Sequence, residues 1–129
     1  MTARQWLRQQ PLIYLWIPLL AWMGLIFYLS AQPDLPRPAT DWLGDVIGMG
    51  GHAFVFGVLA VLWARLLGKR RHPLLLAFLL TMLYALSDEF HQSFVPGRHT
   101  DPLDLLWDGA GAALALGLWA WFRRRSSGD

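Results

Sequence analysis

The amino-acid sequence predicts an all-α integral membrane protein, a four-helix transmembrane bundle with both termini in the cytoplasm. One observation is the length of its apolar runs: no charged residue occurs between Gln9 and Pro33, and about 20 mainly apolar residues cross a bilayer. Another is that basic residues gather at the ends of these runs, as they do beside membrane-spanning helices. With 129 residues, the chain is expected to form a single domain.

The composition narrows the classes of function. Charged residues make up 16% of the chain, well below the roughly 25% of soluble proteins. The chain has no cysteine, which excludes disulfides and thiolate metal sites. The pI of about 9.5 does not indicate a nucleic-acid partner, because the arginines and lysines flank apolar runs and do not form one patch.

The first two predicted helices cover residues 11–30 and 46–66. The apolar part of the first is longer than the roughly 7–15 residues of a cleaved signal peptide, and Pro18 is expected to kink it. The second carries a stripe of small residues suited to close helix contact in lipid. The stripe consists of Ala53, Gly57, Ala60 and Ala64.

The third predicted helix covers residues 73–94 and begins with a first-turn proline, Pro73. Its uncharged part is too short to cross a membrane, so the prediction extends the helix through the polar residues 88–92. Residues 95–98 follow as a turn, with proline and glycine in the two central places.

The fourth predicted helix covers residues 102–122. Asp101 is expected to cap it, and Pro102 takes the first helical position. Gly109, Ala113 and Gly117 give it a second stripe of small residues. Residues 123–129 are predicted to be a basic tail.

The charges alternate along the chain and predict its orientation. The amino terminus, residues 65–72 and the carboxyl tail are basic, whereas the loops at residues 31–45 and 88–104 are acidic. Because basic segments stay in the cytoplasm, we expect both acidic loops on the outer face of the membrane.

This topology brings polar residues of three helices to the outer face as one expected pocket. Asp88, His91 and Gln92 share a face of the third helix, with Glu89 about 100° away, and Asp104 and Asp108 share a face of the fourth. The candidate catalytic residues are Asp88, Glu89, His91 and Arg98. The candidate substrate-binding residues are His52, Gln92, Asp104 and Asp108.

Some of these residues also have a purely structural explanation. Asp101 is expected to be a cap, and Asp104 a favourable charge near a helix amino terminus. A charged group costs roughly 2.5–3.5 kcal/mol near the bilayer centre and less near its surface. Asp88, Glu89 and His91 therefore need either polar partners or a functional role, and we interpret them as a functional site.

The segment DEFHQSFVPGRHTDPLDLLWDGAGAALALG, residues 88–117, resembles the signature of the VanZ-like family of small membrane proteins. The end of the first helix at residues 27–32 and the histidine at residues 52–54 are also similar to that family. Two positions depart from its pattern. Members often carry a lysine before the histidine, where this chain has glycines and a methionine at 48–51, and many have asparagine at the position of Asp108.

The resemblance implies a multi-pass protein of the bacterial cytoplasmic membrane. It also implies a role in low-level resistance to the glycopeptide teicoplanin, through the family's named member. The resemblance does not imply a reaction, so the mechanism has to be inferred from the residues.

One hypothesis is an enzyme that acts on an envelope lipid or a lipid-linked cell-wall precursor at the outer leaflet. Asp88, Glu89 and His91 would supply acid–base chemistry, and Arg98 would hold a phosphate or carboxylate. The acids could instead ligate a divalent metal with Asp104 and Asp108. Oxygen ligands favour Mg²⁺, Mn²⁺ or Ca²⁺, and the histidines leave Zn²⁺ open.

A second hypothesis is a non-catalytic module that binds membrane lipids, a glycopeptide or a partner membrane protein. The small-residue stripes would suit a homo-oligomer as well as internal packing. Ion or proton transport is disfavoured, because below the outer cluster only Thr81 and Tyr84 are polar on the third helix.

Overall fold

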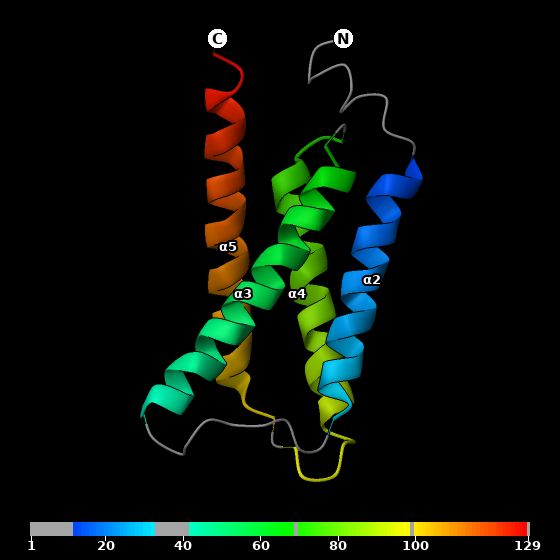
Figure 1. The fold of residues 1–129 in the computed structure, drawn as a ribbon, viewed down its shortest axis with the longest axis vertical. Helices are drawn as coiled ribbons and strands as arrows, with labels where there is room; N and C mark the ends of the chain where they lie inside the picture. The colour runs from blue at the N-terminus through cyan, green and yellow to red at the C-terminus, as the bar shows by residue number, and fades with distance from the viewer. Residues whose placement is uncertain (1–11, 33–41, 69, 99, 129) are drawn as a thin grey trace.

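The computed structural model describes residues 12–32, 42–68, 70–98 and 100–128. In this part of the chain, four helices are long and apolar enough to cross a membrane, as the sequence predicts. They are α2 (Leu12–Ser30), α3 (Trp42–Leu66), α4 (Pro73–Gln92) and α5 (Pro102–Arg125). The helices alternate in direction, so the last turns of α2 and α4 lie at the same end of the bundle as the first turns of α3 and α5 (Figure 1).

Two helices are longer than the sequence predicts. α3 begins at Trp42 and not at residue 46, and α5 continues to Arg125 instead of ending at residue 122. The basic tail predicted for residues 123–129 is therefore helical in its first part. Arginine favours helix, and cations at a helix carboxyl end interact favourably with its dipole. Arg125 also lies over the ring of Trp121, 4.0 Å from its centroid.

α4 is shorter than predicted and ends at Gln92, not at residue 94. The polar residues 88–92 are nevertheless helical, as expected. Beyond them comes the predicted turn, in which the Arg98 amide donates to the Val95 carbonyl at 3.2 Å. Gly97 has φ of 80°, the positive value that the third residue of a type II turn requires.

The start of α5 also follows the sequence pattern. The Asp101 carboxylate accepts a hydrogen bond from the amide of Leu103 at 2.9 Å, with Pro102 in the first turn. The predicted cap is thus confirmed. The polar lead-in at residues 1–10 and most of the acidic loop between α2 and α3 lie outside the described residues.

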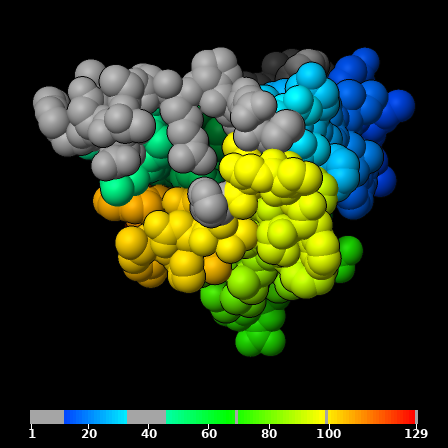
Figure 2. All heavy atoms as spheres, turned by 90° about the horizontal axis from the view of Figure 1, so that it is seen from below, coloured from blue at the N-terminus to red at the C-terminus, as the bar shows by residue number. Residues whose placement is uncertain are grey.

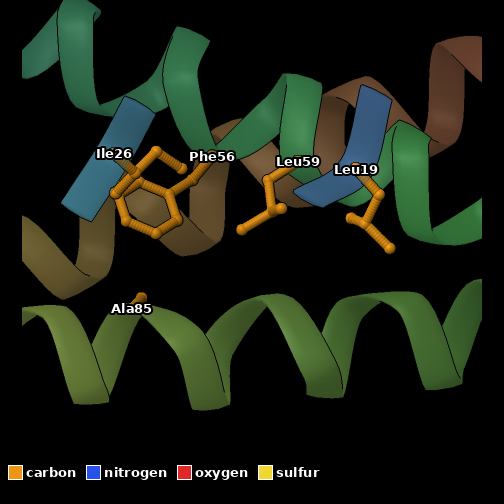
Figure 3. Close-up of a cluster of buried hydrophobic side chains, with 5 residues drawn as sticks. All are labelled: Leu19, Ile26, Phe56, Leu59 and Ala85. Carbon is orange, nitrogen blue, oxygen red and sulfur yellow. The ribbon is translucent and has the colours of Figure 1, made fainter. Parts of the chain in front are cut away.

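α3 packs against all three other helices and most extensively against α5. Its Phe56 and Leu59 are buried in a cluster with Leu19 and Ile26 of α2 and Ala85 of α4. Figure 3 shows the Phe56 ring between Ile26 and Ala85. Many large apolar side chains on the outside of all four helices are exposed, which is the surface that a lipid-embedded bundle presents.

The closest helix contact joins α3 to α5. A Cβ added at Gly111 would lie 2.1 Å from the Ala53 carbonyl oxygen, and one at Gly57 would lie 3.1 Å from the Gly111 carbonyl oxygen. No side chain fits at Gly111, because real Cβ contacts are never so short. The small-residue stripe predicted on α3 therefore serves packing within the chain, where Ala60 and Ala64 are also buried.

The stripe of small residues noted on α5 is not the face that packs against α3. A Cβ at Gly117 would touch nothing within 4 Å, and Gly109 faces the Met82 sulfur of α4. The face that meets α3 carries Gly111 and Ala115. Two helix faces with small residues coexist on α5, and only packing distinguishes the one that α3 uses.

Candidate functional site

The end of the bundle where α4 meets α5 gathers the candidate residues, and we call it the polar end. It consists of Ser30, His52, Asp88, Glu89, His91, Gln92, Arg98, Asp104 and Asp108. Figure 2 looks onto this end, where the last turn of α2, the segment that links α4 to α5 and the start of α5 lie beside one another. Six of the residues form two groups of polar contacts, and three further side chains lie beside them.

The first group, the Ser30 network, joins α2 to α4. The Ser30 hydroxyl donates to Oδ1 of Asp88. The Gln92 amide donates to Oδ2 of Asp88 at 3.2 Å and to the Ser30 hydroxyl at 3.3 Å. All three side chains are buried, with at most 6% of each residue exposed. The Asp88 carboxylate is therefore held from both sides within the protein.

The second group, the His52 network, joins α3 to α5. Nδ1 of His52 lies 2.9 Å from Oδ1 of Asp108, and Nε2 lies 3.6 Å from Oδ2 of Asp104. Asp108 is buried, whereas about a quarter of each of the other two side chains is exposed. The structural explanation of Asp104 as a mere helix-start charge is thus incomplete, since its carboxylate faces a histidine of another helix.

Two residues of α4 lie beside these networks without being part of them. Oε1 of Glu89 and Nδ1 of His91 are both buried and find no hydrogen-bond partner in the described part of the chain. The His91 ring stacks on Phe27 of α2, with centroids 4.4 Å apart and planes 15° apart. Glu89 lies within electrostatic range of His52 and both α5 aspartates, on the side of α4 away from Ser30.

Arg98 lies on the turn next to the networks and is half-buried. Its charge acts on Asp88, but among the described acids none lies within the 4.0 Å of an ion pair. The guanidinium is therefore close to the site and has no carboxylate partner within it.

The structure corrects two expectations about this site. The single pocket expected from the sequence is divided, because Asp88 and Gln92 turn toward α2 while Asp104 and Asp108 turn toward α3. His91 shares a helix face with Asp88 in the sequence pattern, yet it contacts an aromatic ring and not a carboxylate. Within the described residues, no three histidine or acidic side chains form a group that could hold a metal ion.

Sequence reasoning assigned no role to Ser30 and Phe27. Ser30 is a hydroxyl at the last turn of an otherwise apolar helix, which is the signal that could have marked it. Two further polar contacts fix α2 beside the site: the Tyr84 hydroxyl donates to the Met23 carbonyl at 2.6 Å, and Nε1 of Trp22 donates to the Val55 carbonyl at 2.9 Å.

The arrangement can perform acid–base chemistry. A carboxylate that accepts a hydrogen bond from one ring nitrogen of a histidine fixes the orientation of the ring, and the other nitrogen can then exchange a proton. In this site Asp108 would orient His52, and the exposed side of the pair faces Asp104. Glu89 adds an acid within electrostatic range of this pair.

The comparison with known families agrees with this geometry. A family model described as VanZ/LLP1 matches residues 14–123, a range that includes every residue of the polar end. Neither the curated proteins nor the solved structures gave a match. Since the match extends over most of the chain and across all four helices, the protein belongs to the VanZ/LLP1 family.

Proposed function

We propose that the polar end faces the outside of the bacterial cytoplasmic membrane and binds the headgroup of an envelope lipid or a lipid-linked cell-wall precursor. The observation that carries this proposal is the pair of buried polar atoms without partners, Oε1 of Glu89 and Nδ1 of His91. A buried polar atom left unpaired costs about 1–3 kcal/mol. Glu89 lies toward the His52 network and His91 toward Phe27 of α2, so a headgroup would satisfy them with two separate hydroxyl or amide groups.

Charge supports a phosphate in that headgroup. Arg98 is half-buried beside the networks and has no carboxylate within ion-pair distance among the described residues. A guanidinium offers forked donors that match phosphate or carboxylate oxygens. Arg98 would bind the anionic part of the ligand, while Glu89 and His91 would bind its neutral polar groups.

The outward orientation is supported by the opposite end of the bundle. Arg65, Arg70 and Arg71 lie there with the three arginines at the end of α5, whereas every acidic side chain that the structure describes lies on α4, on α5 or at its cap near the polar end. Basic residues beside membrane helices stay in the cytoplasm. The polar end would then meet the outer leaflet.

The cellular consequence that we propose is low-level tolerance to the glycopeptide teicoplanin, in keeping with the VanZ-like family. Asp88, Glu89, His91 and Arg98 are the residues that we expect to carry it. His52, Gln92, Asp104 and Asp108 would shape the binding site.

The test uses full-length protein with Glu89→Gln or His91→Ala, and Ser93→Ala as a control at an exposed position of the same end. Binding of a polyprenyl phosphate is measured by native mass spectrometry, and teicoplanin tolerance is measured in cells that contain equal amounts of each protein. We expect both substitutions to lower binding and tolerance, with the control unchanged. If both variants bind and protect like the control, the proposal is wrong.

A purely structural polar end is the second candidate. The Ser30 network favours it, because Asp88, Ser30 and Gln92 already satisfy one another. In that case the protein would act as a membrane scaffold. His91→Ala would then lower thermal stability without changing teicoplanin tolerance per inserted molecule. If the polar end is instead a binding site, the same variant would lose tolerance at unchanged stability.

A further inference from the structure

A hollow lies between α3 and α5 on the lipid-facing surface of the bundle, away from the polar end. It has a volume of about 420 Å³. It runs along α3 from Ala53 to Arg65 and along α5 from Gly111 to Leu118. Its apolar walls include Phe54, Val58 and Val61 on one side and Leu114 and Leu118 on the other.

The floor and the far end of this groove differ in character. The floor consists of the small residues at the helix crossing, Ala53, Gly57, Gly111 and Ala115, where the two backbones meet closely. At the far end stands Arg65, half-buried in the last turn of α3. No acidic side chain that the structure describes forms an ion pair with it, and a further cation, Arg123 of α5, reaches the loop that follows α3, with Nη1 3.9 Å from a Cβ added at Gly68.

We propose that this groove binds one anionic phospholipid, with an acyl chain in the groove and the phosphate on Arg65. The length fits: Ala53 to Arg65 covers about 18 Å at 1.5 Å per residue, close to the roughly 15 Å of one leaflet's hydrocarbon. The charge also fits, because each basic residue at a membrane surface raises the affinity for anionic lipids about fivefold.

The width favours a hydrocarbon chain over a helix of a second copy. Dividing the groove volume of about 420 Å³ by a length of about 18 Å gives a mean cross-section of about 23 Å². A helix about 10 Å across needs about 80 Å². An extended chain of methylene groups therefore fits within the groove, whereas a helix of a second copy could only lie along its rim.

The experiment measures lipid binding to the delipidated full chain by native mass spectrometry. Phosphatidylglycerol and phosphatidylcholine with identical acyl chains are the two probes. Arg65→Gln removes the cation at the groove, with Arg71→Gln as the matched control outside it. Val61→Trp fills the groove, and Leu79→Trp adds the same bulk at an exposed position of α4.

We expect the unmodified chain to bind one phosphatidylglycerol in preference to phosphatidylcholine. Arg65→Gln should lower phosphatidylglycerol affinity roughly fivefold and leave phosphatidylcholine unchanged, with a smaller effect for Arg71→Gln. Val61→Trp should weaken both lipids, and Leu79→Trp neither. Circular dichroism reports whether each variant is folded, and Val58→Phe replaces Val61→Trp if that variant does not fold.

Three results would overturn the proposal. Equal effects of Arg65→Gln and Arg71→Gln would mean a diffuse charge effect, and equal effects of the two tryptophan variants would mean that the groove is not used. A dimer that Val61→Trp dissociates, with lipid binding unchanged, would make the groove an interface between copies. The outcome is independent of the polar end, because none of these substitutions touches it.

Discussion

The two networks at the polar end are held together in different ways. The Ser30 network is buried and depends on side-chain hydrogen bonds between α2 and α4. The His52 network is partly exposed and sits beside a backbone contact, since His52 precedes Ala53 and Asp108 lies one turn before Gly111. The difference indicates that α2 is attached by polar bonds in addition to its buried Leu19 and Ile26, whereas α3 and α5 are fixed by close packing that also aligns the histidine with its acids.

The largest effect is expected from Gly111→Val, which tests whether packing positions the His52 network. The added side chain would collide with the Ala53 carbonyl, and overpacking of this kind costs about 1–3 kcal/mol or more. Thermal unfolding in detergent measures the loss. Gly117→Val is the matched control, because a Cβ there meets nothing within 4 Å; equal losses for the two variants would contradict the role of the crossing.

Asp88→Ala tests the Ser30 network. It leaves the buried Ser30 hydroxyl without its acceptor, at a cost of about 1–3 kcal/mol, while the Gln92 amide keeps the Ser30 hydroxyl as a partner. Ser30→Ala removes the donor to Asp88 and one of the two acceptors of the Gln92 amide, and a single interhelical hydrogen bond in a membrane protein averages about 0.6 kcal/mol. We expect the unfolding temperature to fall more for Asp88→Ala than for Ser30→Ala. The reverse order would mean that Asp88 is not held by these partners.

Substitutions at Asp108 distinguish the effect of its hydrogen bond to His52 from the effect of its charge. Asparagine at this position, as in many VanZ-like proteins, keeps a side-chain oxygen that can accept from Nδ1 of His52. We therefore expect Asp108→Asn to change stability by less than about 1 kcal/mol and Asp108→Ala by more. Nitrogen NMR of His52 should show the same ring tautomer in the asparagine variant as in the parent chain, and a changed tautomer would show that the charge is needed.

Asp104→Asn should have the smallest effect on stability. Its carboxylate lies 3.6 Å from the His52 ring and is about a quarter exposed, and exposed ion pairs contribute about 0–1 kcal/mol. Unfolding measured at low and high salt should differ less for this variant than for the parent chain. A loss as large as that of Asp108→Ala would show that the two aspartates act as one unit.

Much of the fold follows from local pattern. The structure has four apolar runs as helices, Pro73 and Pro102 near helix starts, the Gly97 turn and the Asp101 cap. All of these depend on neighbouring residues only. The helix ends were less accurate, because Trp42 and the arginines after Phe122 can continue a helix as readily as leave it.

The sequence predicted most residues of the polar end, but not Ser30 and not which side chains contact one another. The helical angle of about 100° between neighbours already separated Asp88 from Glu89. This angle alone could not tell whether Asp88 or Glu89 points toward α2. That depends on where α2 packs, and Ser30 as the partner of Asp88 is 58 residues away in the sequence.

The sequence by itself determined the number of membrane helices, the end of the bundle at which the acids and histidines gather, and the resemblance to the VanZ-like family. These properties come from hydrophobic runs, turn residues and charge, which act over a few residues. Only the tertiary structure decided that the polar residues form two networks, that Glu89 and His91 keep unpaired atoms, and that a groove opens beside Arg65. The His52 network and the groove depend on how closely α3 approaches α5 at Ala53 and Gly111, whereas the Ser30 network and the His91 ring contact depend on where α2 packs against α4.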